Sequence, residues 1–168
     1  MSASIAVREV RDSDLEAFFE HQCEPAALRM AAFPTRAREP FMAHWARIRA
    51  DPKVVARTVL FNGDVAGNVV SWEQESRRLV GYWIGQAYWG KGVATKAVAQ
   101  FLAEYPPRPL FARVAQQNVA SIRVLERNGF LLVGEERGVS IAGGAPADEF
   151  LYALGPSEGP RAAAPPRA

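Results

Sequence analysis

A glycine-flanked lysine, Gly90-Lys91-Gly92, stands between an aromatic segment typical of a strand and an amphipathic segment typical of a helix. Glycine lets a backbone approach a ligand closely, and the first amides of a helix have no partner inside it. The helix dipole also favours negative charge at that end. The stretch therefore predicts a site for an anion such as a phosphate, although by itself it is also typical of a turn that caps a helix.

The glycine spacing does not match the two common nucleotide-binding loops. Gly85 and Gly90 have the four-residue gap of a Walker loop, but Lys91 is followed by Gly92 where that loop needs Ser or Thr. The dinucleotide pattern G-x-G-x-x-G is absent. A phosphate bound here would therefore belong to another class of ligand.

Composition narrows the protein class. The chain has 168 residues, of which 49% are hydrophobic and 23% charged, as expected for one packed domain. The 20 basic and 18 acidic residues are interspersed, which predicts no nucleic-acid surface. No apolar run reaches the roughly 18 residues of a membrane span, and the N-terminus lacks a signal-peptide core. One cysteine and two histidines predict a cytoplasmic protein with no disulfide and no metal site.

Hydrophobic periodicity predicts an α/β (α+β) domain over residues 1–154, followed by a disordered Pro/Ala-rich tail over 155–168. Strands are predicted at 4–10, 54–61, 65–72, 79–84, 110–115, 130–139 and 149–154. Helices are predicted at 12–22, 26–32, 40–50, 91–105 and 118–128. The crossover from 79–84 through helix 91–105 to 110–115 indicates one parallel pair inside a mostly antiparallel sheet.

Local signals set the expected boundaries of these elements. Asp12 is the expected N-cap of the first helix, and Asn62-Gly63-Asp64 predicts a tight hairpin turn. The polar residues 73–77 predict a break between two strands. Val119 is expected on the buried side of the last helix.

Three segments, in this order, resemble the GNAT superfamily of acyl-CoA-dependent N-acetyltransferases. They are the strand end Tyr82-Trp-Ile84, the loop Gly90-Lys-Gly-Val-Ala94, and Asn118-Val-Ala-Ser121 ahead of a helix that ends in Gly-Phe. The superfamily pattern is Q/R-x-x-G-x-G/A, followed about 25 residues later by N-x-x-A/S. The resemblance covers about residues 4 to 154. The Tyr-Trp strand and the W-G-K-G loop are most similar to the ribosomal-protein N-terminal (Rim-type) branch.

The resemblance implies a fold, a reaction and a set of ligands. The fold would be a sheet of about seven strands, splayed between the fourth and fifth, with four or five flanking helices, in a monomer or homodimer. The reaction would move acetyl from acetyl-CoA to a primary amine, such as a peptide N-terminal amine, without a metal. The backbone after residue 81 would pair with the pantetheine arm, and the Ile84 amide or its neighbour would stabilise the oxyanion. The expected cofactor-binding residues are Tyr82, Trp83, Ile84, Gly90, Lys91, Gly92, Val93, Ala94, Thr95 and Asn118.

The acid–base residues depart from the superfamily pattern. Trp89 stands at the Q/R position, Leu125 where many members have a Tyr acid, and Arg113 where a related branch has a Glu base. The substitutes are Ser121 as a donor to the leaving sulfur and Glu73 as a base acting through water. Ser121 could instead be a local cap, and Glu73 a solvated surface carboxylate. Two further candidates, Tyr82 and His44, are also typical of packed core positions.

Two other functions fit the same residues. One is acetylation of a small amine such as an antibiotic, a polyamine or an amino acid. The other is a GNAT fold that binds acyl-CoA without turnover, because a fold does not fix a function. Release of free CoA thiol in the presence of a panel of amines would separate these alternatives.

Overall fold

The computed structural model describes residues 2–31, 36–105, 107–139 and 147–155, and the predicted tail from 156 onward lies outside them. A seven-stranded sheet forms the centre of the molecule, in the order β1-β2-β3-β4-β5-β7-β6. The strands are β1 (Ile5–Glu9), β2 (Val55–Phe61), β3 (Asp64–Gln74), β4 (Arg77–Ile84), β5 (Leu110–Ala115), β6 (Leu131–Val139) and β7 (Ala147–Leu154). β4 and β5 are parallel, and every other neighbouring pair is antiparallel. The predicted fold class is confirmed.

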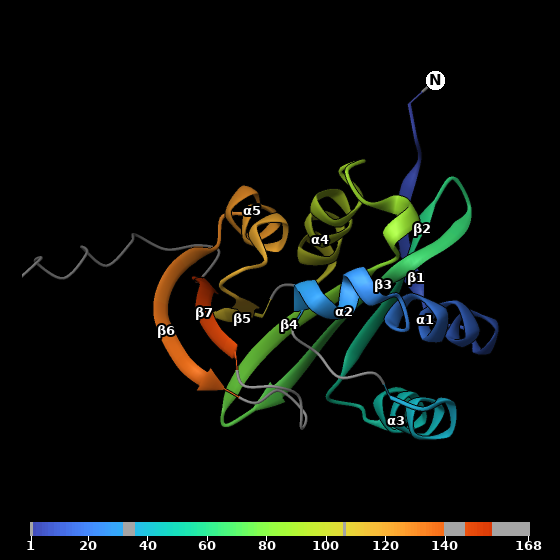
Figure 1. Ribbon diagram of the computed structural model, residues 1–168, viewed down its shortest axis with the longest axis horizontal. Helices are drawn as coiled ribbons and strands as arrows, with labels where there is room; N and C mark the ends of the chain where they lie inside the picture. Colours follow the sequence, from blue (N-terminus) through green and yellow to red (C-terminus); the bar gives the residue numbers. More distant parts are fainter. Residues whose placement is uncertain (1, 32–35, 106, 140–146, 156–168) are drawn as a thin grey trace, which may run out of the picture.

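Helices cover both faces of the sheet, α4 and α5 on one and α1 and α3 on the other (Figure 1). The helices are α1 (Leu15–Gln22), α2 (Pro25–Ala31), α3 (Arg38–Ala50), α4 (Val93–Glu104) and α5 (Val119–Arg127). Short 3₁₀ turns precede α1 at Asp12–Asp14 and follow β4 at Gln86–Tyr88. No helix in the described part of the chain is long and apolar enough to cross a membrane.

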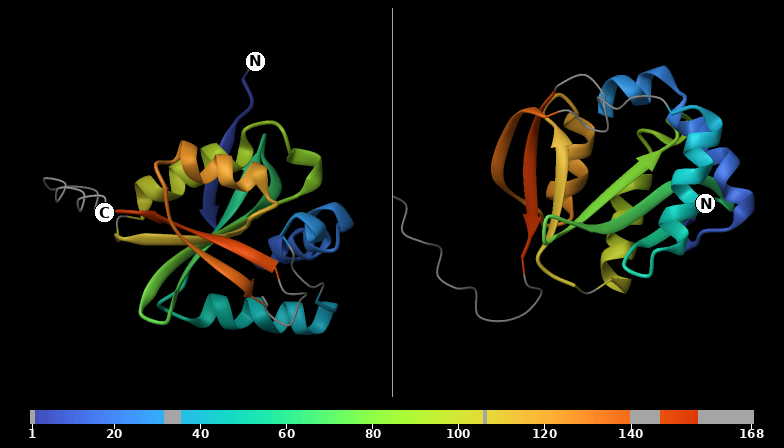
Figure 2. Two further views of the ribbon diagram at one scale, coloured as in Figure 1. Left: turned by 60° about the vertical axis from the view of Figure 1, so that its left-hand side comes forward. Right: turned by 90° about the horizontal axis from the view of Figure 1, so that it is seen from below.

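The sheet opens between β4 and β5. Within the described residues these two strands share a single register pair, Leu79 with Phe111, near the start of each strand. Beyond that pair the strands diverge, as the right-hand view of Figure 2 shows. The predicted splay between the fourth and fifth strands is confirmed, and it exposes the edges of two otherwise buried strands to a ligand.

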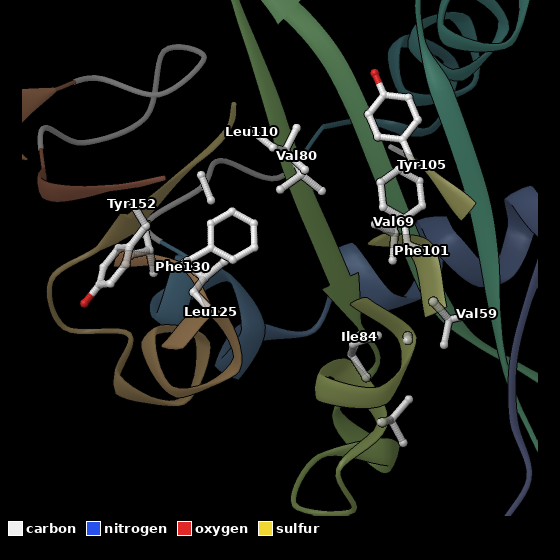
Figure 3. Packing of buried hydrophobic residues seen from close by; sticks show 14 of the residues in the cluster. Val59, Val69, Val80, Ile84, Phe101, Tyr105, Leu110, Leu125, Phe130 and Tyr152 are labelled. Carbon is white, nitrogen blue, oxygen red and sulfur yellow. The ribbon is translucent and has the colours of Figure 1, made fainter. Parts of the chain in front are cut away.

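The larger core lies between the sheet and the pair α4 and α5. Figure 3 shows Phe101 of α4 beside Val69, and Phe130 beside Leu125 of α5. The apolar stripe of α4 is buried as its periodicity predicts. Val119 contradicts its prediction, because its side chain is 50% exposed. Val119 is the first residue of α5, which begins beyond the end of β5. The sheet therefore does not extend far enough to cover its side chain.

A second core, made by aromatic residues, fixes α1 and α3 to the opposite face. Phe18 of α1 and Trp45 of α3 pack with ring centroids 4.9 Å apart, and Phe41 joins them. Partly buried residues of β2 and β3, among them Ala56 and Val70, complete the contact. This packing fixes the position of α1 and α3 on the face of the sheet opposite to α4 and α5.

The start of α1 is held by Asp14, not by Asp12 as the sequence suggested. Asp14 is 1% exposed and accepts hydrogen bonds from both Nη atoms of Arg8, at 2.7 and 2.9 Å. Its Oδ2 also accepts from the hydroxyl of Thr58 at 2.6 Å and from the amide of Arg11 at 2.8 Å. Asp12 is exposed and pairs with Arg49. Asp14 is the N-cap residue of α1, but its side chain makes no capping bond to that helix and instead ties the 3₁₀ turn to β1 and β2.

Asp14 predicts a loss of stability in acid. Burial opposes ionisation of this carboxyl, but the bonds from Arg8, Thr58 and Arg11 outweigh it and lower its pKa to about 2. Because the folded-state pKa lies below the unfolded value, this contribution is complete above about pH 4 and is lost as pH falls towards 2. Lowering this pKa from 3.8 to about 2 corresponds to about 2.5 kcal/mol.

Asp14→Asn should therefore lower the free energy of unfolding by about 3 kcal/mol at neutral pH, because it leaves the Arg8 charge without its partner. It should also remove the acid dependence between pH 4 and 2. Urea unfolding of both proteins from pH 2 to 7 measures both effects. Asp12→Asn is the control, with an expected change of about 0.5 kcal/mol or less, since it alters an exposed ion pair. Equal losses in the two variants would contradict the role of Asp14.

The predicted polar break at residues 73–77 is wrong. β3 runs to Gln74 and β4 begins at Arg77, so only Glu75 and Ser76 form the turn. Both turn residues have positive φ, 52° and 63°, although neither is glycine. Polar residues occupy the strand ends because these ends project beyond the core, where the backbone ladder needs no apolar side chain.

Candidate active site

The edge of β4 that faces the gap carries backbone groups that make no hydrogen bond to β3. The amide of Gly85 donates to the carbonyl of Ala66 at 2.9 Å, one step beyond the register pair of Gly67 with Ile84. Bonded and non-bonded pairs alternate along an antiparallel ladder, so Trp83 bonds to β3 whereas Tyr82 and Ile84 turn their N–H and C=O groups towards the gap. A ligand in the gap therefore meets strand-like donors and acceptors.

The turn after β4 exposes the N-terminus of α4. Gly90 and Gly92 both have φ of +74°, a conformation that L side chains rarely adopt. A Cβ placed on either glycine would meet no atom within 4 Å, so the turn borders open space. Gly92 is the N-cap without any side-chain capping bond, and the first bond of the helix runs from the amide of Lys96 to Gly92. The amides of Val93, Ala94 and Thr95 precede that bond and can receive an anion.

A cavity of about 380 Å³ lies between this turn and α5. Eight of the ten residues expected to bind the cofactor line it: Tyr82, Trp83, Ile84, Gly90, Gly92, Ala94, Thr95 and Asn118. The other two point elsewhere. The Nζ of Lys91 lies 5.3 Å from the ring centre of Phe61, and the side chain of Val93 is 2% exposed in the core. Val93 can therefore contribute only its backbone amide.

Sequence reasoning missed several residues of the same cavity. Arg123 and Arg127 line it from α5, four residues apart and so on one side of the helix. Two arginine side chains on one helix face can bind phosphate groups. Their four-residue spacing is visible in the sequence and could have predicted this role. Trp89 also lines it, and its Nε1 donates to the carbonyl of Ile84 at 2.8 Å. The indole thus gives the last carbonyl of β4 a hydrogen-bond donor. Trp89 stands at the position where the superfamily pattern has Gln or Arg.

Tyr82 and Ser121 meet across the gap. The Tyr82 hydroxyl lies 2.6 Å from the Ser121 Oγ and 3.1 Å from the Ser121 carbonyl oxygen. Asn118, the N-cap of α5, accepts from the Ser121 amide at 3.2 Å, so the local cap role is fulfilled by Asn118. Burial raises the pKa of Tyr82 well above its ordinary value, and the bond with Ser121 only partly opposes this. The pair therefore stays protonated and can donate.

A larger cavity of about 1050 Å³ meets the smaller one at Tyr82, Trp83, Asn118 and Ser121, which line both. Its other walls come from α1, α3, the β3–β4 hairpin, β5, β6 and β7. Glu73 lines this cavity but is exposed, and its Oε2 lies 3.9 Å from the Nη2 of Arg78. Arg78 is four residues before Tyr82, or about 13 Å along the strand. A proton relay from Glu73 to the shared wall would need several waters.

The end of α1 is fastened to the end of β4. The Nε1 of Trp83 donates to the carbonyl of His21 at 3.2 Å, and the amide of Gln86 donates to the Oε1 of Glu24 at 2.9 Å. Gly85 permits this approach, because a Cβ there would lie 2.5 Å from the His21 ring. Burial lowers the pKa of His21. These contacts position the strand edge that carries Tyr82 and Ile84.

The site can hold a long, anionic, partly strand-like ligand in the smaller cavity and a second molecule in the larger one. The two would meet at the hydroxyl pair of Tyr82 and Ser121. No group of three His, Cys, Asp or Glu side chains in the described ranges is arranged to bind a metal ion.

Comparison with known proteins agrees with this geometry. Residues 5–131 match the acetyltransferase (GNAT) domain family. The chain belongs to the GNAT acetyltransferase family. The resemblance inferred from the Gly90–Ala94 and Asn118–Ser121 segments is confirmed. GNAT enzymes use acetyl-CoA as the acyl donor, and the open turn, the α4 amides and the two α5 arginines fit its pyrophosphate and its extended arm.

Two of the proteins similar to this chain have names that refer to ribosomal acetylation. The protein YdaF of Bacillus subtilis (strain 168), whose name assigns it provisionally to the ribosomal N-acetyltransferases, is 29% identical over 124 residues. That match covers 70% of this chain and 68% of YdaF. The structure of RimL, a ribosomal L7/L12 α-N-protein acetyltransferase, superposes with a TM-score of 0.78 at 17% identity, over 90% of this chain and 94% of RimL.

The same fold also occurs in GNAT proteins with other acceptors. Spermidine N-acetyltransferase from Vibrio cholerae, solved with CoA and spermine, gives a TM-score of 0.79 at 15% identity. The superposition covers 91% of this chain and 96% of that enzyme. At these identities the likeness establishes the fold alone.

Proposed function

We propose that this GNAT acetyltransferase moves the acetyl group of acetyl-CoA to a primary amine by direct attack, with a peptide α-amine as the favoured acceptor. The observation that carries the proposal is the meeting of the two cavities at Tyr82 and Ser121. A thioester that reaches this wall from the smaller cavity would face an amine that enters from the larger one. The likeness to YdaF supports a peptide acceptor. The exposed, unpaired Cys23 is in keeping with a cytoplasmic setting.

The chain's own groups would act at three points. The backbone of Tyr82 and Ile84 would hold the pantetheine arm, and the Ile84 N–H would donate to the carbonyl oxygen as negative charge develops there. The hydroxyl pair would donate to the departing sulfur, whose conjugate thiol has a reference pKa near 8.5. Asn118 would fix the start of α5, and hence Ser121, against the gap.

Amine basicity favours an α-amine. A peptide α-amine has a reference pKa near 7.7–8.0, so a useful fraction is neutral at pH 7.5, whereas a lysine-like amine near 10.4 is almost wholly charged. The larger cavity nevertheless favours cations. Among the described residues that line it, five carboxylates face three permanent cations: Asp51, Glu73, Glu75, Glu136 and Glu149 against Arg36, Lys53 and Arg113. A small polyamine is therefore the second candidate acceptor.

The test is CoA-thiol release from acetyl-CoA with matched acceptors. A short peptide with a free N-terminus, the same peptide N-acetylated, spermidine and free amino acids form the panel. The proposal expects release with the free peptide and none with its N-acetylated form. Release with spermidine alone would reassign the acceptor, and tight acetyl-CoA binding without release for any amine would overturn the enzymatic function.

A further inference from the structure

Glu149 of β7 is a buried carboxylate with no role in the proposed mechanism. Its side chain is 2% exposed and lines the larger cavity. Its Oε1 has no hydrogen-bond partner in the described part of the structure. A buried carboxylate oxygen without a donor is costly, so it marks a place where a donor from outside the chain would be stabilising.

Neighbouring strands place two further charges beside Glu149. Glu149 pairs with Ala115 of β5 and with Glu136 of β6, so Glu136 shares its face of the sheet. Arg113, two residues before Ala115, lies on that face too, and its Nε is 3.6 Å from the Oε2 of Glu136. One cation thus serves two carboxylates, and the group has a net negative charge when Glu149 is ionised.

The cluster lies on the acceptor side of the shared wall. Tyr152 and Phe150, which alternate with Glu149 along β7, pack in the core with α4 and α5, so Glu149 points to the opposite face. Ala115, its register partner, accepts a hydrogen bond from the amide of Asn118 at 2.9 Å. Glu149 is therefore paired with the residue that binds Asn118, and Asn118 in turn holds the amide of Ser121.

We propose that Glu149 binds the ammonium group of the acceptor inside the larger cavity and takes its first proton. This inference rests on the proposed function. The carboxylate receives one proton from the ammonium, and the neutral nitrogen forms a bond to the thioester carbon. The C–S bond then breaks, the nitrogen loses its second proton to the departing sulfur through the hydroxyl pair, and Glu149 releases its proton to solvent.

The local charges suit such a role. Burial raises the pKa of Glu149, Arg113 partly opposes the rise, and Glu136 adds to it, so the carboxylate is a stronger base than an exposed one. The cavity is also lined by the ionisable residues Arg36, His44, Asp51, Lys53, Glu73, Glu75 and Tyr82. Burial is the largest cause of the lowered pKa of His44 and of Arg36. A cationic acceptor would therefore find its counter-charge at Glu149 and Glu136.

The test compares Glu149→Gln with wild type, using the acceptor on which wild type is most active. Glu149→Gln should lower kcat/KM for the amine about 100-fold at pH 7, within what a positioned base contributes. The loss should shrink above pH 9, where the amine is neutral without help. The affinity for acetyl-CoA and the melting temperature should stay unchanged. Glu149→Asp, which keeps the charge, should recover part of the activity.

Glu135→Gln is the matched control. It removes a carboxylate from the neighbouring exposed position of β6, which does not line the larger cavity, and kcat/KM should stay within about twofold, since surface charges contribute little. Unchanged kcat/KM in Glu149→Gln, or a loss that is independent of pH, would overturn this inference while leaving the proposed function intact. A wild-type protein that binds acetyl-CoA but acetylates no amine would overturn both.

Discussion

Ser121→Ala is expected to lower kcat about 10- to 100-fold, near the low end of what a positioned acid contributes. The Ser121 hydroxyl lies 2.6 Å from that of Tyr82, and both line the wall shared by the two cavities. If the Tyr82 hydroxyl donates to the Oγ, the Ser121 proton is free to reach the sulfur. Thiolate protonation helps but is not obligatory at neutral pH, because the leaving thiol has a reference pKa near 8.5.

Tyr82→Phe tests whether the two hydroxyls act as a unit. We expect kcat to fall by a factor similar to that for Ser121→Ala. The double variant should be no slower than the slower single variant, because the effects of two groups in one hydrogen-bonded pair are not additive. Burial keeps Tyr82 protonated, so kcat should show no decline from its ionisation up to about pH 10.

Ser71→Ala is the control for these variants. It removes another buried hydroxyl of the sheet, one that lines neither cavity and has no hydrogen-bond partner among the described residues, and kcat should not change. Initial rates of CoA release over pH 6–10 measure all four variants. A complete loss of turnover in Ser121→Ala would show that the acid is essential, and full activity in both single variants would exclude the pair from proton transfer.

Gly92→Asp should raise the Kd for acetyl-CoA about 30-fold. The side chain would enter open space at the N-terminus of α4, where the pyrophosphate is expected. Two unit charges about 8 Å apart at an effective dielectric constant of about 20 repel by about 2 kcal/mol. Asp tolerates a positive φ better than most residues and is a good N-cap, so the fold should persist.

Gly92→Asn isolates the charge in this experiment, because Asn has the same shape and similar backbone preferences. Calorimetry should give the Asn variant a Kd within about fivefold of wild type, and the Asp effect should shrink at high salt, where surface charges are screened. Equal affinity of wild type and Gly92→Asp would place the phosphates elsewhere. Equal weakening in both variants would make backbone shape, rather than charge, the cause.

Features that depend on local chemistry followed from the sequence. The apolar stripe of α4, the glycine turn before it, and Asn118 at the start of α5 are set by residues within one or two helical turns. Eight expected cofactor residues accordingly line one cavity. Predictions from local sequence were wrong at solvent-exposed positions, where polar and apolar residues are both tolerated, as at the Glu75–Ser76 turn and at exposed Val119.

Features that join distant segments were decided by the tertiary structure. Tyr82 and Ser121 are 39 residues apart and meet only because the sheet splays and α5 begins at the gap. The register of β6 shifts between Leu132 and Gly134, so one extra residue brings Glu136, and not Glu135, opposite Glu149. Alternation along a strand tells which residues share a face, but only strand pairing and its bulges decide which of them lie together, and so which carboxylates face the acceptor.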